Sequence, residues 1–386
     1  MKVLHLIKTS EGASWAFRQI AVLLSHGISV EVALPAPGPM SVAYEALGIP
    51  VHYMRTDIAE LVNPWRFWKQ RRALRRLVKL HKYDIIHSHF VGTTVFTRLA
   101  LGRFGKTRRV FQVPGPLHLE NWLTRTLELA TAGPRDSWIA SCKATRSAYL
   151  ARGIDPARVG LAYYGIDFST FLSGTRPDLR AQFGFGPQTR LIGMVAYIYG
   201  PKRWLGQRRG IKGHDDLIDA AHQLIRQGED IACIFVGGPW KNAEAYAQAL
   251  QRYAAEKLEG RAVFLGNRND VSSLYLDFDV AVHPSHSENV GAAAESLPLE
   301  FPTIATNVGG FPDLVVHGVT GWLVPPKSPT ALAATIQEVL ADPAEAAQRA
   351  LRGRELALTL FDVQSTGGDV LKFYRSLGQA EPLAHD

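Results

Sequence analysis

The sequence has few of the features that hold small secreted proteins together or anchor proteins in a membrane. Of its 386 residues two are cysteines, Cys142 and Cys233, each inside an apolar stretch; two such thiols indicate neither a disulfide framework nor a zinc site. No apolar run reaches the roughly 18 residues that a transmembrane helix requires. The apolar opening at residues 3–7 is short and leads into a loop, which predicts a first buried strand and not a signal peptide. We therefore expect a cytoplasmic protein.

Charge is spread unevenly along the chain. Residues 1–170 contain 23 Lys and Arg against 11 Asp and Glu, whereas the rest contains 20 against 24. A basic first half suits an anionic substrate, a membrane surface or nucleic acid. The fractions of hydrophobic and charged residues, 46% and 20%, are those of a globular protein, and the length predicts two domains of roughly 150 to 200 residues each.

Short apolar segments alternate with amphipathic helices along the whole chain. The expected strands are residues 3–7, 29–34, 49–53, 84–87, 110–113 and 138–140 in the first half, and 191–195, 232–236, 263–265, 280–283 and 303–306 in the second. The expected helices include residues 15–26, 64–81, 215–227, 242–257, 330–340 and 369–377. Continuous apolar strands separated by helices predict parallel sheets covered on both faces. A Gly-, Pro- and polar-rich stretch at residues 171–189 separates the two series, so we predict two doubly wound α/β domains, residues 1–180 and 181–362.

Ligands of open parallel sheets bind at the carboxyl ends of the strands, and the residues after the expected strand 280–283 are the most informative. Glu288 lies in the loop, Gly291 lets the backbone approach a ligand and can begin a helix, and Glu295 falls in the first or second turn of that helix. A helix N-terminus offers N–H groups to a diphosphate, and a carboxylate accepts hydrogen bonds from ribose or sugar hydroxyls. The alternative is that Glu295 complements the helix dipole and that Glu288 is a solvated loop charge.

This stretch resembles the nucleotide-sugar signature of the family 4 retaining glycosyltransferases of GT-B fold. The matching positions are Pro284-Ser285, Glu288, Gly291, Glu295, Pro302 and Gly309-Gly310. The resemblance extends over nearly the whole chain. It implies two Rossmann-like domains that face a central cleft, with a terminal helix in residues 363–386 that crosses back to the first domain.

The resemblance also implies roles for the residues of this stretch. By resemblance Glu295 holds the donor ribose, Glu288 contacts the donor sugar in a catalytic position, and backbone amides around Asn289 and Gly291 meet the diphosphate. The two glutamates are separated by one residue fewer than in the family pattern.

A second group of candidate donor-binding residues precedes the helix expected at residues 215–227. Lys212 lies in a glycine-flanked loop, where its charge would add to that of the helix end in binding a diphosphate; the alternative is a surface lysine beside a turn. The family has an arginine at the end of the preceding strand, and the alignment places Tyr197 there. We predict that a basic residue of the intervening loop supplies the missing charge. The candidates are Arg203, which is the first choice, Lys202, Arg208 and Arg209.

Histidines near strand ends of the first half are candidates for the acceptor side. His87 and His89 end the strand expected at residues 84–87, where the family has a His-x-His motif. A structural role is favoured for His87, and His89 is the better catalytic candidate. The family also has a histidine in the loop after the next strand; here it is displaced to His118, a weaker catalytic candidate, with Glu120 near it on the acceptor side.

Two further loops complete the expected donor site. Gly12 lies in the first strand-to-helix loop, where the family commonly has Gly-Gly close to the donor phosphate, although a lone glycine there is often an ordinary turn residue. Asn267 and Arg268 follow the expected strand 263–265 and correspond to the position at which the family cradles the base.

The helix expected at residues 64–81 is strongly basic. Residues 65–82 include eight Lys or Arg and no acidic residue, and three aromatic residues stand near their start. Leu74, Leu77 and Val78, at helical spacing, form the expected buried stripe and leave the arginines outside. Such a helix suits an anionic membrane surface; the alternative is a solvated helix face. Nucleic acid is not expected, because no recognition motif accompanies the charge.

These features predict a retaining glycosyltransferase of the hexosyltransferase type in surface polysaccharide or glycoconjugate synthesis, peripheral on the inner face of the cell membrane. The expected donor is a nucleotide sugar, with UDP favoured over GDP, and the expected acceptor is a glycan or a polyprenyl-diphosphate-linked sugar. Lys212, a loop arginine and helix-end amides would stabilise the departing diphosphate, and no Asp-x-Asp motif stands at a strand end, so we expect neither a metal nor a cofactor. The alternatives are a nucleotide-sugar 2-epimerase of the same fold and a non-catalytic glycan-assembly protein.

Overall fold

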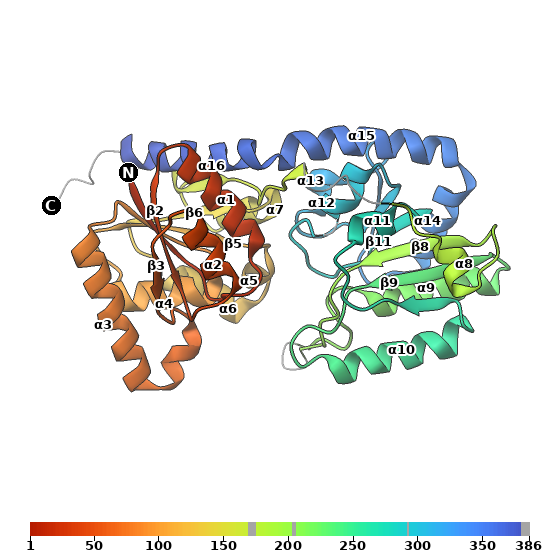
Figure 1. The fold of residues 1–386 in the computed structure, drawn as a ribbon, viewed down its shortest axis with the longest axis horizontal. Helices are drawn as coiled ribbons and strands as arrows, with labels where there is room; N and C mark the ends of the chain where they lie inside the picture. Colours follow the sequence, from red (N-terminus) through yellow and green to blue (C-terminus); the bar gives the residue numbers. More distant parts are fainter. Residues whose placement is uncertain (169–174, 203–205, 292, 380–386) are drawn as a thin grey trace. The chain divides into compact units, whose positions relative to one another are not determined.

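The computed structural model describes residues 1–168, 175–202, 206–291 and 293–379. The chain divides into two compact units (Figure 1). Unit 1 contains residues Met1–Asp167 and Leu360–Asp386, and unit 2 contains residues Phe168–Thr359. Each unit is built around its own parallel β-sheet, as the alternation of apolar strands and helices predicts.

Unit 1 has a seven-stranded parallel sheet with the order β3-β2-β1-β4-β5-β6-β7. Its strands are β1 (Lys2–Leu6), β2 (Ser29–Leu34), β3 (Val51–Tyr53), β4 (Ile85–Ser88), β5 (Arg108–Val113), β6 (Asp136–Ala140) and β7 (Val159–Leu161). Neighbouring residues of one strand serve different cores: Val3 packs with helices on one face, and Leu4 packs with helices on the other. Burial on both faces explains why these strands are continuously apolar.

Helices cover both faces of the unit 1 sheet. They are α1 (Ser14–Ser25), α2 (Pro39–Ala46), α3 (Pro64–His81), α4 (Val91–Leu101), α5 (Leu117–Glu120), α6 (Trp122–Ala130), α7 (Lys143–Leu150) and α16 (Val363–Gln379), with short 3-10 turns η1 (Ile58–Val62) and η2 (Pro156–Arg158). The C-terminal helix α16 packs on α1 and adds Val370, Leu371 and Tyr374 to the core of this unit.

Unit 2 has a six-stranded parallel sheet with the order β10-β9-β8-β11-β12-β13. Its strands are β8 (Arg190–Val195), β9 (Ile231–Val236), β10 (Ala262–Phe264), β11 (Val280–His283), β12 (Thr303–Thr306) and β13 (Trp322–Val324). The helices are α8 (Leu179–Phe183), α9 (His214–Arg226), α10 (Glu244–Leu258), α11 (Val271–Tyr275), α12 (Ala293–Ser296), α13 (Phe311–Leu314), α14 (Pro329–Ala341) and α15 (Pro343–Phe361), with the 3-10 turn η5 (Leu297–Leu299).

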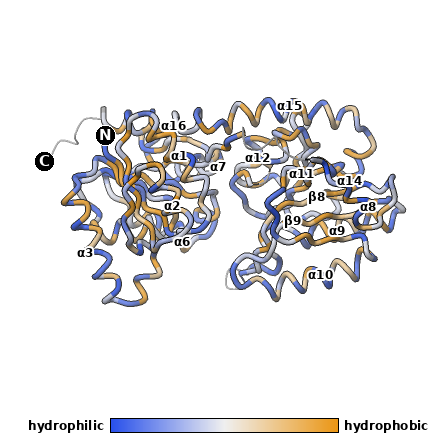
Figure 2. The backbone as a smooth tube through the Cα atoms, in the orientation of Figure 1, coloured by the Kyte–Doolittle hydropathy of each residue, from blue (hydrophilic) through white to orange (hydrophobic). Residues whose placement is uncertain are grey.

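The hydropathy of the backbone follows this architecture. Apolar residues are concentrated in the strands, whereas outer helices such as α10 and α15 alternate between apolar and hydrophilic residues (Figure 2). None of the described helices combines the length and the apolar character that crossing a bilayer would demand.

The boundary between the units lies earlier than the predicted residue 180. The units divide after Asp167, and α8 belongs to unit 2 because Asp277 holds its first turn: the Asp277 carboxylate accepts the Leu179 N–H at 2.6 Å. Arg180 adds an ion pair to the same carboxylate at 3.2 Å. The polar composition of residues 171–189 indicated a linker, but ion pairs to unit 2 fix its second half.

Candidate active site

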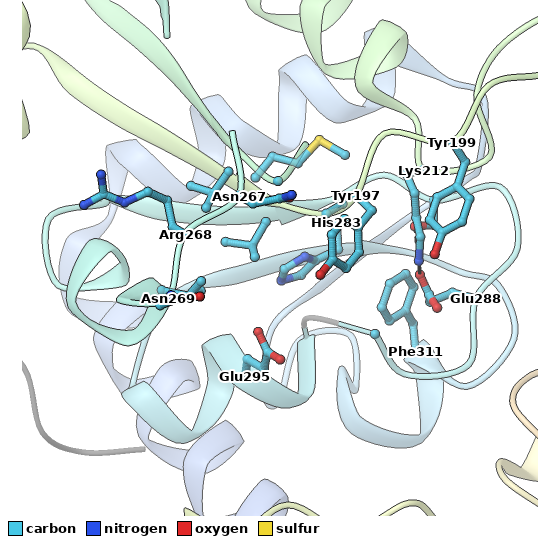
Figure 3. Close-up of a pocket in the computed structure, with 18 residues that line it drawn as sticks. Tyr197, Tyr199, Lys212, Asn267, Arg268, Asn269, His283, Glu288, Glu295 and Phe311 are labelled. Atoms are coloured by element: carbon cyan, nitrogen blue, oxygen red, sulfur yellow. Dashed lines mark hydrogen bonds and ion pairs between the residues drawn. The ribbon is translucent and has the colours of Figure 1, made fainter. Parts of the chain in front are cut away.

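A cavity of about 590 Å3 opens where the strands β8, β9, β10 and β11 of unit 2 end (Figure 3). It is lined by Met194, Val195, Ala196, Tyr197, Tyr199, Lys212, Val236, Gly237, Asn267, Arg268, Asn269, Val271, His283, Ser285, Glu288, Gly291, Glu295 and Phe311. These residues lie at the ends of β8, β9 and β11 or in the loops and helices that follow the five strands β8 to β12, which the parallel sheet brings to one edge. The cavity therefore occupies the place where open parallel sheets bind ligands.

A charged pair marks one end of this cavity. The Lys212 ammonium forms an ion pair with the Glu288 carboxylate, which also accepts the Ser285 hydroxyl at 3.3 Å and the Asn289 N–H at 3.0 Å. Both charged side chains are largely but not fully buried. An anionic ligand group at this place would interact directly with Lys212, while Glu288 keeps oxygen atoms available for hydroxyl groups.

Two glycines allow the backbone around Glu288 to pack closely. A Cβ on Gly309, whose φ is +54°, would lie 1.7 Å from the Glu288 carbonyl oxygen. A Cβ on Gly213, whose φ is +76°, would lie 2.0 Å from the Pro284 carbonyl oxygen. A side chain at either position would therefore displace the loop after β11, which carries Glu288.

Glu295 lies on α12 and points toward the cavity from the side opposite the β8 loop (Figure 3). As predicted from the sequence, it lies in the first turn of a helix that follows Gly291. This helix has four residues and passes directly into η5. Few peptide dipoles are aligned there, so individual N–H groups and side chains, and not a helix macrodipole, would bind a ligand.

The loop after β10 forms the other end of the cavity. The Asn267 side-chain oxygen accepts the Gly238 N–H at 2.7 Å, which ties this loop to the one after β9. Arg268 is exposed and forms two hydrogen bonds with Asp270, at 2.8 and 2.6 Å. Both predicted base-side residues thus line the cavity, and each already has a partner within the unit. Asn289, a predicted donor-binding residue, is absent from the lining; its side-chain oxygen is buried without a described hydrogen-bond partner.

His283 lines the cavity but adds no charge to it. Burial, and then the nearby Lys212, lower the pKa of His283 to about 3. Its Nε2 lies 3.0 Å from the Ser296 hydroxyl. Because this imidazole stays neutral at physiological pH, Lys212 supplies the positive charge at its end of the cavity.

In unit 1, three imidazoles stack at the edge where β1 and β4 end. His5 lies opposite His87 on the neighbouring strand, and the ring centroids of His87 and His89 are 4.2 Å apart. The His5 Nδ1 and His89 Nε2 atoms are 2.9 Å apart, and His87 Nδ1 lies 2.5 Å from the Tyr374 hydroxyl. The three ring planes are inclined to one another by 15° to 38°, and one ring nitrogen from each histidine lies within 4.8 Å of the others, close enough for a metal ion.

All three stacked histidines are fully buried. Burial lowers the pKa of His89 to about 3 and places the pKa values of His5 and His87 well below their usual range. Trp15 and Tyr164 contact His89, with ring centroids 5.7 and 6.4 Å away. The structure therefore places His89, the predicted catalytic histidine, against aromatic side chains. It also adds His5, which the sequence analysis missed, to the histidines at this edge of the sheet.

His118 lies inside unit 1 and not at an open surface. Its Nδ1 lies 3.2 Å from the Gly115 carbonyl oxygen and its Nε2 lies 2.9 Å from the Tyr149 hydroxyl. Burial lowers its pKa. With both ring nitrogens bonded inside the unit, the geometry favours a positioning role over the predicted catalytic one. Glu120 is exposed at the end of α5, and Gly12 is exposed in the loop before α1.

Two profiles of known families match the chain. The profile described as "Glycosyltransferase Family 4" matches residues 13–170, and the one described as "Glycosyl transferases group 1" matches residues 205–355. The first coincides with most of unit 1 and the second with most of unit 2.

The chain belongs to the family 4 glycosyltransferases. Among relatives, D-inositol 3-phosphate glycosyltransferase of Mycolicibacterium gilvum (strain PYR-GCK) is 32% identical over 191 residues, 48% of this chain and 40% of that protein. The enzyme of the same name from Mycolicibacterium vanbaalenii is 32% identical over 211 residues, 51% and 44% of the two chains. The matched region thus spans less than half the length of these relatives.

Solved structures confirm the GT-B fold of the chain. The Anabaena protein HepE, in complex with UDP-glucose, superposes with a TM-score of 0.79 at 23% identity over 97% of this chain and 100% of that chain. Sucrose-phosphate synthase from Thermosynechococcus elongatus superposes with a TM-score of 0.77 at 19% identity, over 99% and 100%. At these identities the likeness concerns the fold.

The sequence resemblance aligns Tyr197 with an arginine of the family pattern. Of the loop residues predicted to replace that charge, Arg203 lies outside the described residues. Arg209 forms ion pairs with Asp216 at 2.8 Å and Asp219 at 2.7 Å, which anchor the loop to α9. Lys202 and Arg208 are exposed. Arg209 is thus paired with α9. The remaining candidates for the positive charge expected at the position of Tyr197 are Lys202, Arg203 and Arg208.

Proposed function

We propose that the chain transfers a hexose from a nucleoside diphosphate sugar, preferably a UDP-sugar, to a hydroxyl group of its acceptor with retention of configuration. The observation that carries this proposal is the convergence of Lys212, Glu288 and Glu295 on one cavity at the edge of a parallel sheet. The names of the relatives and the complexes of HepE with UDP and UDP-glucose support it.

The chemistry follows from the charges around the cavity. Cleavage of the bond between sugar and diphosphate leaves negative charge on the phosphate oxygens, and Lys212 lies where it would stabilise that charge. Glu288 would orient the donor sugar and Glu295 the ribose. We propose that this charge stabilisation needs no metal ion or other cofactor; transfer that is abolished by EDTA and restored by Mg2+ would contradict this part.

We further propose a glycan or a polyprenyl-diphosphate-linked sugar as acceptor, in the synthesis of surface polysaccharides or glycoconjugates, and an anionic membrane as the surface on which it is met. Leu74 and Leu77 are buried against unit 1, as predicted, whereas Trp65 and Trp68 at the start of α3 are 86% and 52% exposed. Exposed tryptophans followed by a row of arginines suit the boundary between acyl chains and anionic headgroups.

The membrane proposal is tested with sedimented vesicles. The wild type should bind phosphatidylglycerol vesicles more strongly than phosphatidylcholine vesicles, and Arg72→Glu with Arg76→Glu should remove the difference. The matched control is Arg252→Glu with Lys257→Glu on α10. Equal binding of the wild type to both vesicles, or equal effects of the two double variants, would contradict it.

The donor site is tested by calorimetry with UDP and GDP on the wild type and on Glu295→Ala, with Glu295→Gln as the control for size. Selective binding of UDP, lost in Glu295→Ala, is the expected result. Binding of neither nucleotide would argue for a non-catalytic protein.

Product analysis separates the remaining alternatives. Transfer releases free UDP as a stable product, whereas a 2-epimerase converts one UDP-sugar into another without doing so. NMR of the product of transfer should show the anomeric configuration of the donor, and an inverted product would refute retention.

A further inference from the structure

Unit 2 exposes an aromatic cluster beside its charged cavity. Its exposed large hydrophobic side chains, among the described residues, are Tyr197, Trp240, Val316, Val319 and Leu351. The two aromatic ones are neighbours: Tyr197 is 46% exposed, Trp240 is 39% exposed, and their ring centroids are 5.0 Å apart. Tyr199 joins them, 6.0 Å from Trp240. We call Tyr197, Tyr199 and Trp240 the aromatic rim.

The backbone holds the aromatic rim in place. The segments that follow β8 and β9 continue side by side. The Ile198 N–H donates to the Gly238 carbonyl at 2.9 Å, and the Trp240 N–H donates to the Ile198 carbonyl at 2.9 Å. This extension of the sheet places Tyr197 and Trp240 next to each other. The rim is therefore pre-organised, and little conformational entropy would be lost when a ligand packs on it.

The aromatic rim borders the end of the cavity that carries the charges. Tyr197 and Tyr199 line the cavity together with Lys212 and Glu288, and the Lys212 ammonium lies 5.8 Å from the centre of the Tyr199 ring. In Figure 3 the Tyr197 ring stands over the middle of the cavity, and Tyr199 lies beside Lys212. Tyr197 and Tyr199 thus line the same cavity as the charged pair, whereas Trp240 is absent from the lining and packs against both tyrosines.

This combination matches the chemistry of a sugar ring. One face of a pyranose carries mainly C–H groups, which pack on aromatic rings, while its hydroxyls need charged or polar partners at the edge. Adjacent exposed aromatic side chains at a polar cavity mark a binding surface more than scattered surface residues do. We propose that the aromatic rim is a platform for the donor sugar ring, with Glu288 taking its hydroxyl groups; this rests on the proposed function.

The test separates the sugar from the nucleotide. Calorimetry measures the affinities for UDP and for UDP-glucose with the wild type, Tyr197→Ala and Trp240→Ala. We expect the affinity for UDP-glucose to fall about threefold to tenfold, the range of an aromatic contact, and the affinity for UDP to stay unchanged. Tyr197→Phe and Trp240→Phe should retain most of the affinity, and Leu351→Ala on α15 is the control for an exposed apolar side chain away from the cavity.

Each other outcome overturns the proposal in a distinguishable way. Equal losses for UDP and UDP-glucose would show that the rim contacts the nucleotide, and unchanged affinities for both would show that it contacts neither. If the wild type binds neither UDP nor UDP-glucose, the proposed function itself, with a UDP-sugar as donor, is contradicted before any variant is compared.

Discussion

The strand ends of unit 1 gather neutral imidazoles, whereas those of unit 2 gather opposite charges around a cavity. His5, His87 and His89 are fully buried, while Lys212 and Glu288 retain contact with solvent. Both sets follow strands of a parallel sheet, so topology alone does not decide their character. The packing of aromatic side chains over the unit 1 edge makes the difference.

The ion pairs of the two units also differ in burial, and those inside unit 1 are the more deeply buried. Arg98 forms ion pairs with Glu128 at 3.2 Å and Asp136 at 2.8 Å, with all three side chains almost wholly buried. The Trp138 indole N–H donates to Glu128 at 2.8 Å. Unit 1 therefore uses buried charge to hold its structure together, and unit 2 keeps a charged pair at a surface where a ligand can reach it.

The largest effect is expected when a buried ion pair of unit 1 is broken. Glu128→Ala leaves Arg98 short of a partner inside the unit and should lower the free energy of unfolding by about 3–5 kcal/mol. Hydrogen–deuterium exchange should rise in residues 108–140 and stay unchanged in unit 2. Glu120→Ala, at an exposed position, is the control, and equal exchange in the two variants would contradict the prediction.

The next effect concerns the charged pair of unit 2. Under the proposed function Lys212→Ala removes the cation that would face the leaving diphosphate, and kcat/KM should fall about 100-fold to 1,000-fold. Arg252→Ala on α10, which removes a positive charge far from the cavity, should leave kcat/KM unchanged. A Lys212→Ala enzyme with nearly full activity would show that another residue stabilises the leaving group.

The histidine stack predicts a dependence of stability on pH. Because burial lowers the pKa of His89 to about 3, only the unfolded chain binds a proton there between pH 6.5 and 3, so stability is complete above pH 6.5 and falls below it. Between pH 6 and 4.5, His89→Gln should reduce the slope by about 1.4 kcal/mol per pH unit. The exposed His26→Gln is the control, and an unchanged slope in His89→Gln would mean that the imidazole is protonated in the folded protein.

The smallest effect tests the base side of the cavity. Asn267→Ala removes the acceptor of the Gly238 N–H, which ties the loop after β10 to the loop after β9, and should lower the free energy of unfolding by about 1 kcal/mol; under the proposed function the loosened loop should also weaken UDP binding. Asn269→Ala, in the same loop, should change the affinity less. Titration calorimetry measures both, and equal losses would place the contact elsewhere in the loop.

Much of the architecture could be predicted from the sequence because local patterns carry it. The structure reproduces the expected helix at residues 64–81 as α3 and shifts most other expected elements by one or two residues. The strands β7 and β13 were missed, although β3 and β10 are equally short and were predicted. The helix α15 was missed because it mixes apolar and charged residues along its length.

The residues of the candidate sites also divide into those with a local sequence signal and those without one. Lys212, Gly291 and Glu295 stand beside glycines or in a motif whose spacing is readable, and the cavity contains them all. His5, Tyr199 and Trp240 carry no local signal, since their partners come from other strands. His118 was a weaker catalytic candidate by resemblance, because the family has a histidine in the loop after β5; its burial against Tyr149 has no local signal in the sequence.

The sequence by itself determined the two parallel sheets, the basic first half, the family, and the residues that follow β11, because hydrophobic periodicity and short motifs act over a few positions. Only the tertiary structure decided the burial of the imidazoles and the aromatic rim. His87 meets Tyr374, 287 residues away, and Tyr197 meets Trp240 from the loop after β9. Such pairs arise when strands and helices pack, and packing sets whether a polar side chain holds the fold together or remains accessible to a ligand.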